Sequence, residues 1–347
     1  MRSSRARDQG FYRGTGDTGR HNAITDVPGV RVGHATIAEP PPVHSGVSVI
    51  GIGDVNPNAP LPAGLSVANG YGKLIGATQL AELGRIEAPI VLTSTLSAFT
   101  AADAMVTWML QRQDCAHVRS FNPVVGECND SVLSDIRARP VSTEHVLRAL
   151  TDVAGGPVAE GSVGAGTGLI ALGFKAGIGT ASRVVGLQGH PVTVGVLVQA
   201  NFGGVLRLAG REVPAPQPVA DGDRDGGAAG AAGEEGSCMI IVVTDAALDA
   251  RQLNRLAARA AFGLGRVGAS YSHGSGDYAI AASTRGTPDP PPDHALDPLF
   301  TGVLDATEES VLNALSAAAP VTTAEGRRIP ALSDVAGVAS PDIGAAR

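Results

Sequence analysis

Short runs of apolar residues bounded by glycine or proline alternate along this chain with longer segments in which apolar residues recur every three or four positions. The short runs predict buried strands, which we expect over residues 47–52, 90–95, 192–199, 238–243 and 278–282. Helical spacing predicts helices over residues 99–112, 143–153 and 308–318. Because the two kinds of segment interleave at short spacing, the chain is predicted to have an α/β or α+β fold.

A further helix is expected after the strand at 238–243. Asp245 is predicted to cap it, since an aspartate side chain accepts hydrogen bonds from the free N–H groups of a first helical turn. Leu253, Leu256, Ala260 and Leu264 then follow one apolar stripe. That stripe predicts a helix with one face against the core.

Glycine is concentrated in two segments of different character. Residues 161–180 mix glycine with apolar residues, which favours backbone packed closely between layers. The glycines at 164–168 lack both the Lys-Ser/Thr ending of a P-loop and the G-x-G-x-x-G order of a dinucleotide site. Residues 221–236 hold six glycines, four alanines and five acids without apolar periodicity. They therefore predict a solvated linker, which we place over residues 212–236.

The linker ends at Gly236-Ser237, immediately before an apolar strand. An ordinary surface loop is one interpretation. The pair also fits an N→O acyl shift, because glycine tolerates strained backbone and a serine hydroxyl on a rigid strand can attack the preceding carbonyl. Hydrolysis of the resulting ester would leave Ser237 with a free α-amine. One residue would then supply both a nucleophile and a base.

Charge and composition exclude several classes of partner. The chain has 347 residues, enough for one large domain or two ordinary ones, and a formal net charge of −7 without a basic block. It is therefore a poor candidate for nucleic-acid binding. The chain has no run of about 18 apolar residues, so no membrane span is predicted. The first twenty residues are polar and Arg-rich, unlike a secretory signal, so we expect a cytoplasmic location.

Metal and cofactor chemistry find no support in the sequence. Cys115, Cys128 and Cys238 lie far apart and are odd in number, which predicts neither a disulfide framework nor a zinc site. The eight histidines show no metal-ligand spacing and no H-E-x-x-H occurs. No G-x-S-x-G turn is present either, which argues against an ordinary α/β-hydrolase. We expect no metal and no cofactor.

Several long blocks resemble the self-processing aminopeptidases of peptidase family S58, which include L-aminopeptidase/D-amidase-esterases and β-peptidyl aminopeptidases. The blocks are HNAITDVPGVRVGHATI (21–37), NPVVGECNDSVLSDI (122–136), GSVGAGTGLIALGFKAGIGTASRVVG (161–186), VLVQANFGG (196–204), GSCMIIVVTDAAL (236–248) and SGDYAIAAST (275–284). They occur in the family's order and cover nearly the whole chain.

The resemblance implies a four-layer αββα sandwich, similar to N-terminal-nucleophile hydrolases but with its own connectivity. It implies cleavage before Ser237 into chains 1–236 and 237–347, which stay together and assemble as a tetramer. The expected organisation is an N-terminal arm (1–20), a single hydrolase domain (21–320) and a C-terminal tail (321–347). The implied substrates are short peptides, amino-acid amides or esters.

The same resemblance implies roles for individual residues. Ser237 matches the nucleophile, whereas Cys238, a rival on chemistry alone, fits a buried small hydrophobe better. Asn201 matches an oxyanion donor, although a turn asparagine before glycine is the plainer interpretation. Ser275 and Asp277 match a pair that orients the nucleophile, and a polar turn is the alternative. Some relatives carry glutamate where this chain has the shorter Asp277.

Glu127 lies in a mostly apolar stretch, and a buried carboxylate needs a charged or donor partner. A structural ion pair with an arginine is one interpretation. The resemblance favours an anchor for the substrate's ammonium, which would explain aminopeptidase action. Some relatives carry a tyrosine shortly after this glutamate, and this chain does not. Asn129 is the candidate to replace that donor.

Two other functions fit the same blocks. A self-cleaving acyltransferase of the ornithine-acetyltransferase type has a related fold, although its nucleophile is usually threonine. A non-catalytic relative would be an uncut oligomeric binding protein.

Overall fold

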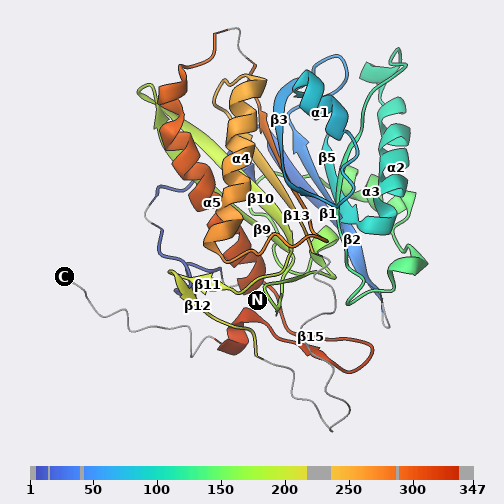
Figure 1. Ribbon diagram of the computed structural model, residues 1–347. Coiled ribbons are helices and arrows are strands. Elements are labelled where there is room, and N and C mark those ends of the chain that lie inside the picture. Colours follow the sequence, from blue (N-terminus) through green and yellow to red (C-terminus); the bar gives the residue numbers. More distant parts are fainter. Residues whose placement is uncertain (1–4, 15, 40–42, 217–235, 287–288, 336–347) are drawn as a thin grey trace, which may run out of the picture.

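Two β-sheets form the centre of the molecule (Figure 1). The computed structural model describes residues 5–14, 16–39, 43–216, 236–286 and 289–335. One sheet has the strand order β1 (Val30–Glu39), β2 (Val43–Ile52), β5 (Ile90–Ser94) and β6 (Val124–Cys128). The other has the order β4 (Arg85–Ile86), β3 (Leu61–Gly70), β14 (Gly276–Ser283), β13 (Ser237–Thr244), β10 (His190–Asn201) and β9 (Ile178–Leu187).

Helices cover the outer face of each sheet. Helices α2 (Ala98–Leu110) and α3 (Thr143–Thr151) pack on the four-stranded sheet, and α4 (Ala250–Arg266) and α5 (Asp297–Ser316) pack on the six-stranded one. Figure 1 shows the order α4 and α5, sheet, sheet, α2 and α3. The predicted four-layer αββα sandwich is therefore confirmed. A short helix, α1 (Ala77–Leu83), contacts β3 and β4.

Shorter elements complete the fold. Two-stranded ribbons pair β7 (Ile170–Ala171) with β8 (Phe174–Lys175), β11 (Arg207–Leu208) with β12 (Arg211–Glu212), and β15 (Val321–Thr322) with β16 (Arg328–Ile329). The 3-10 helices are η1 (Ile24–Asp26), η2 (Thr95–Ser97), η3 (Gln113–Cys115), η4 (Ile136–Ala138), η5 (Gly164–Gly166), η6 (Asp293–Leu296) and η7 (Leu332–Val335). Within the described ranges, no helix is both long and apolar enough to cross a bilayer.

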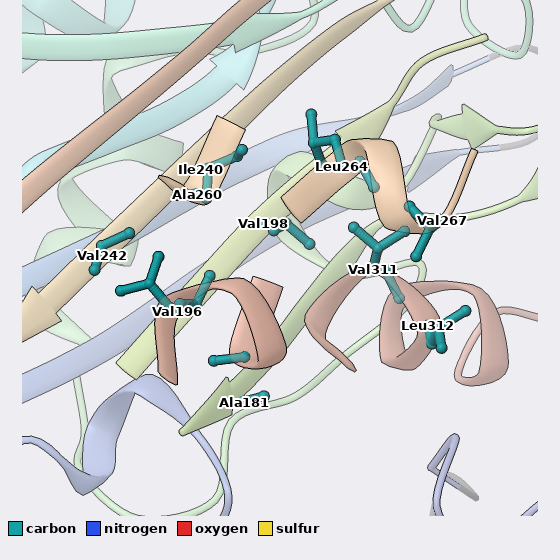
Figure 2. Close-up of a cluster of buried hydrophobic side chains, with 14 of the residues drawn as sticks. Ala181, Val196, Val198, Ile240, Val242, Ala260, Leu264, Val267, Val311 and Leu312 are labelled. Carbon is teal, nitrogen blue, oxygen red and sulfur yellow. The ribbon is translucent and has the colours of Figure 1, made fainter. Parts of the chain in front are cut away.

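Strand β13 is buried on both faces, which explains its unbroken run of apolar residues. Ile240 and Val242 point toward the helices, where Figure 2 shows them with side chains of β10, α4 and α5. Met239 and Ile241 point the other way and pack in the core between the two sheets. Because successive side chains of a strand alternate between its faces, this one strand contributes both to the core beneath α4 and α5 and to the core between the two sheets.

The predicted strands and helices are confirmed in place, with two corrections. Asp245 does not cap α4. Its Oδ1 accepts a hydrogen bond from the N–H of Thr193 at 2.7 Å, and the cap is Asp249, whose Oδ1 accepts from the N–H of Gln252 at 2.7 Å. The last helix begins at Asp297 rather than at residue 308, with Pro298 in its first turn. Proline fits there because the first turn has no use for its missing N–H.

The glycines of 161–180 allow close contact between backbones, as the sequence predicts. A Cβ on Gly179 would lie 1.9 Å from the carbonyl oxygen of Ser310, so β9 and α5 pack backbone against backbone. A Cβ on Gly177 would lie 1.9 Å from the carbonyl oxygen of Gly161. Any side chain at these positions would separate the layers.

Residues near both ends of the described part of the chain contact the sandwich. The guanidinium of Arg7 lies 2.6 Å from Glu309 on α5, and the carbonyl of Pro330 accepts a hydrogen bond from the N–H of Lys175 at 2.8 Å. The boundaries expected at residues 20 and 320 stay predictions. Most of the linker expected over 212–236, from 217 to 235, lies outside the described residues.

Candidate active site

Three strand ends meet at Ser237. It is the first residue of β13, where it pairs with Asn201 at the end of antiparallel β10 and with Gly276 at the start of parallel β14. The side chain is nearly buried, with 5% of the residue exposed. Sheet pairing therefore places the two candidate residues Ser237 and Asn201 side by side, although they are 36 positions apart in the sequence.

A small pocket opens beside Ser237. Its lining residues come from β6, the start of β13, η2 and the loops around them, and they are Tyr71, Gly72, Lys73, Thr95, Glu127, Asn129, Gly236, Ser237 and Gly274. Glu127, Asn129, Gly236 and Ser237 were candidates from the sequence, whereas the others were not. Lys73 was the one detectable signal among them, since the chain has only two lysines.

Gly236 is held tightly just before the strand. A Cβ at this position would lie 2.9 Å from both the carbonyl oxygen of Asn201 and the Cα of Phe202, too close for any larger residue. The carbonyl oxygen of Gly236 accepts a hydrogen bond from the N–H of Gly276 at 3.2 Å. The Gly236–Ser237 peptide bond is thus fixed between two neighbouring strands.

Asn201 is the last residue of β10 and not a turn residue after it. Its Oδ1 accepts from the N–H of Ile170 at 3.1 Å, and its Nδ2 donates to the carbonyl of Asn129 at 2.9 Å. The first bond fixes which end of the amide is the donor. Because a primary amide carries two N–H groups, one donor remains for another acceptor.

Ser275 and Asp277 form a buried pair at the start of β14. The Oγ of Ser275 donates to Oδ1 of Asp277 at 2.8 Å, so the shorter aspartate reaches its neighbour. Each residue is 2% exposed, and Oδ2 of Asp277 has no hydrogen-bond partner among the described residues. Burial raises the pKa of Asp277 above its usual range. Neither residue lines the pocket, so any action on a substrate is indirect.

Glu127 is a buried carboxylate at the wall of the pocket, with 2% of the residue exposed. Its Oε1 accepts from the backbone N–H of Lys73 at 2.7 Å, and its Oε2 accepts from the hydroxyl of Thr95. Among the described residues no arginine forms an ion pair with it, which removes the structural ion pair as an interpretation. Both donors are neutral, and the only nearby cation among the pocket's lining residues, Lys73, forms no ion pair with the carboxylate.

The segment after Glu127 is bent by its own side chains. Oδ1 of Asn129 accepts from the N–H of Ser131 at 2.9 Å, an Asx-type turn. The next residue, Asp130, is 3% exposed and accepts from the hydroxyl of Ser94 at 2.9 Å. Burial raises the pKa of Asp130 to about 6.

The two cysteines near Ser237 are buried and poor nucleophiles. Cys238 faces the helices in the core of β13 and is fully buried. The Sγ of Cys128 donates to the carbonyl of Ser237 at 3.1 Å. Burial raises the pKa of both thiols well above the usual range. Since the thiolate is the reactive form, the interpretation of Cys238 as a small hydrophobe is confirmed.

Metal ligands do not gather near this pocket. Across the part of the chain that the structure describes, no three side chains of His, Cys, Asp or Glu come together in a way that would hold a metal ion.

Comparison with known proteins gives a consistent result. The profile of Peptidase family S58 matches residues 22–329. Beta-peptidyl aminopeptidase BapA of Sphingosinicella microcystinivorans is 38% identical over 360 aligned positions, which cover 94% of this chain and 89% of the relative.

Two solved structures have the same architecture. A beta-aminopeptidase of Burkholderia sp. superposes with a TM-score of 0.86 at 37% identity, covering 99% of this chain and all of the other. The L-aminopeptidase D-Ala-esterase/amidase of Ochrobactrum anthropi, described as a prototype of the serine aminopeptidases and a new variant of the Ntn-hydrolase fold, gives a TM-score of 0.82 at 37% identity, covering 95% of each chain.

Proposed function

This chain belongs to peptidase family S58 and is a serine-type aminopeptidase, and from that premise we propose that it cuts itself at Gly236–Ser237 and then uses Ser237 as the nucleophile. One observation carries the proposal. Ser237 and the buried carboxylate of Glu127 line the same pocket, and Gly236 directly precedes Ser237 there. A nucleophile and an anchor for a positive charge are thus close enough to act on one small substrate.

Self-cleavage begins with the hydroxyl of Ser237. Its oxygen attacks the carbonyl carbon of Gly236, the C–N bond of the Gly236–Ser237 peptide breaks, and the nitrogen takes up the proton. Water then hydrolyses the ester, leaving a carboxylate on Gly236 and a free α-amine on Ser237. The fixed geometry of the Gly236–Ser237 bond supports this step, since holding the reacting groups in place supplies much of the acceleration in intramolecular reactions.

Substrate hydrolysis reuses the same hydroxyl. The α-amine of Ser237, with an ordinary pKa of about 7.7–8, accepts the proton of the hydroxyl as Oγ attacks the substrate carbonyl. Nδ2 of Asn201 donates its remaining N–H to the developing oxyanion. The α-ammonium gives the proton it took from the hydroxyl to the leaving amine or alcohol. Water then attacks the acyl-enzyme, and the free acid is released. Ser275 and Asp277 hold the strand start at which Ser237 lies.

Glu127 selects substrates that carry a free amino group. A substrate ammonium beside its carboxylate would add a charged partner to the two neutral donors, the backbone N–H of Lys73 and the hydroxyl of Thr95. Only a terminal residue brings an ammonium next to the attacked carbonyl, which favours removal of one N-terminal residue. We therefore propose short peptides, amino-acid amides and esters as substrates. From the resemblance to the family, we also propose that the cut protein assembles as a homotetramer.

The experiment that tests this function is an intact mass measurement of the purified protein together with its Ser237→Ala variant. We expect chains of 236 and 111 residues from the wild type and one uncut chain of 34.9 kDa from the variant. Turnover of a panel of L-, D- and β-aminoacyl p-nitroanilides is expected from the wild type alone. An uncut wild-type protein without turnover would point to the non-catalytic alternative, and faster transfer to amines than to water would point to the acyltransferase.

A further inference from the structure

The carbonyl that is cut in the precursor already has a hydrogen-bond donor. The N–H of Gly276 donates to the carbonyl oxygen of Gly236 at 3.2 Å. This is the first bond of the parallel ladder between β13 and β14, whose last bond joins the N–H of Thr284 to the carbonyl of Thr244 at 2.9 Å. The ladder bond at the cut thus has the position that an oxyanion donor needs.

Asn201 points elsewhere in the uncut chain. Its Nδ2 donates to the carbonyl of Asn129, and its Oδ1 is held by the N–H of Ile170. The described hydrogen bonds of this side chain do not include one to the carbonyl of Gly236. Asn201, the donor proposed for the substrate, adjoins the pocket through its contacts with Asn129 and Ser237 and is not itself a lining residue. It is therefore not the group that contacts the carbonyl to be cut.

The two reactions present their carbonyls from different directions. The Gly236 carbonyl is bonded to the nitrogen of Ser237, so it follows the path of β13 and lies next to β14. A substrate carbonyl has no bond to that nitrogen and reaches Oγ from the pocket, where Glu127 and Asn129 lie. A donor fixed in the ladder suits the first carbonyl, and a side chain directed at Asn129 suits the second.

We propose that self-cleavage and substrate hydrolysis use different oxyanion donors, namely the backbone N–H of Gly276 for the first and the side chain of Asn201 for the second. The inference rests on the proposed function. In the first step Oγ of Ser237 bonds to the Gly236 carbonyl carbon, the carbonyl oxygen becomes negative, and the Gly276 N–H stabilises it. The tetrahedral species then collapses as the C–N bond breaks and the nitrogen gains the proton.

Glycine at 276 is part of this arrangement. A Cβ on Gly276 would lie 2.5 Å from both the nitrogen and the Cα of Gly72. A larger residue would push β14 away from the loop that carries Gly72 and Lys73, and would shift the N–H that contacts the Gly236 carbonyl. A side-chain substitution at 276 therefore tests packing as well as chemistry, so the decisive change has to remove the N–H alone.

The first arm of the test uses Asn201→Ala. We expect it to be cut at a rate within about threefold of the wild type, followed by mass spectrometry, whereas its turnover of an aminoacyl p-nitroanilide falls about 10²–10³-fold. Asn201→Asp, which keeps the size and loses the donor, controls for packing. An uncut but folded Asn201 variant, with folding judged by circular dichroism against Ser237→Ala, would overturn the proposal.

The second arm replaces the amide of Gly276 by an ester, through in vitro translation with glycolic acid at that position. Loss of this one N–H is expected to slow self-cleavage about 10- to 100-fold. The matched control is an ester at Thr284, which removes the last bond of the same ladder and should leave the cleavage rate unchanged. Equal rates for the Gly276 ester and the wild type would refute the inference, while failure of the wild type to cleave would refute the proposed function instead.

Discussion

Two buried ionisable side chains, Glu127 in the pocket and Lys175 outside its lining, lead to predictions at the scale of single residues. Glu127 is a buried carboxylate that accepts hydrogen bonds from two neutral donors and faces a pocket, and no ion pair to it is present among the described residues. Such a charge costs free energy unless a cation joins it. Lys175 is a buried basic side chain whose Nζ donates to the carbonyls of Gly166, Leu169 and Ala176 at 3.4, 3.0 and 2.6 Å.

Glu127→Gln is expected to lower kcat/KM for an aminoacyl p-nitroanilide about 10- to 100-fold. A hydrogen bond to a charged group contributes about 1.5–3 kcal/mol, and the amide keeps the shape but loses the attraction for an ammonium. Self-cleavage should be unaffected because the precursor presents no ammonium at this position. Steady-state kinetics and intact mass on the same preparation check both expectations. Unchanged kcat/KM would exclude Glu127 as the anchor.

Lys175 makes stability depend on pH. Burial lowers the pKa of its ammonium from 10.5 to about 7. Between these two values the unfolded chain binds the proton and the folded chain does not, so the free energy of unfolding rises with pH, by up to about 1.4 kcal/mol per unit. Below pH 7 both states are protonated and this dependence ends.

The measurement is urea unfolding at several pH values from 6 to 9.5, comparing Lys175→Met with the protein that retains Lys175. Both proteins carry Ser237→Ala, so that each is a single chain. The difference in unfolding free energy between them should change with pH above 7 and be flat below it. A difference that is constant over the whole range would mean that Lys175 keeps its proton in the folded state.

At the scale of elements, the two layers β9 and α5 owe their contact to a missing side chain. A Cβ on Gly179 would meet the carbonyl oxygen of Ser310 at 1.9 Å and the backbone nitrogen of Ala314 at 2.6 Å. Both atoms belong to helix backbone and cannot move aside alone. The helix would have to lift from the strand as a unit.

Gly179→Ala is therefore expected to lower the free energy of unfolding by about 1–3 kcal/mol, the usual cost of overpacking a filled core. Gly186→Ala is the matched control, because Gly186 is also in β9 and a Cβ there meets nothing within 4 Å. Denaturant unfolding in the Ser237→Ala background compares the two. Equal losses for both variants would mean that α5 adjusts without cost.

Burial on both faces made β13 predictable from the sequence, but not β6, whose five residues are all buried and include Gly126 and Glu127. The apolar run of β13 predicts a strand directly, whereas β9 begins at the end of the glycine-rich segment 161–180 and itself mixes glycine, serine and arginine with apolar residues, so its pattern predicts no strand. Likewise the start of α5 at Asp297 has no side-chain cap and is marked only by Pro298 in its first turn, outside the apolar spacing that predicts its second half.

Some residues of the candidate site could be identified from the sequence and others could not. Ser237, Gly236 and Glu127 could be found because each has an unusual neighbourhood in the sequence. Tyr71 and Thr95 could not, since one lies in a loop and the other in η2, and they meet at the pocket only through tertiary packing. The donor that contacts the Gly236 carbonyl is a backbone N–H, and no residue type marks it.

At the scale of the whole molecule, the proposed cut falls inside the central sheet. The strand order β4-β3-β14-β13-β10-β9 places the two strands that follow residue 236 between strands that precede it. Helices α4 and α5 also follow residue 236. Helix α4 packs on β3 of the first chain and on β13 and β14 of the second, and α5 packs on β9 and β10 of the first chain. Neither piece has a complete core without the other, so the two chains are expected to stay together after cleavage.

This interleaving changes the molecularity of folding. Before the cut, refolding is a first-order process within one chain. After it, the sheet can form only when two chains collide, and β13 and β14 must insert between β3 and β10, so regain of structure becomes second order. Refolding of the cut enzyme from urea should slow about tenfold when protein concentration falls tenfold, while Ser237→Ala refolds at one rate throughout. The cut enzyme would then retain a fold that formed while the two chains were still covalently joined.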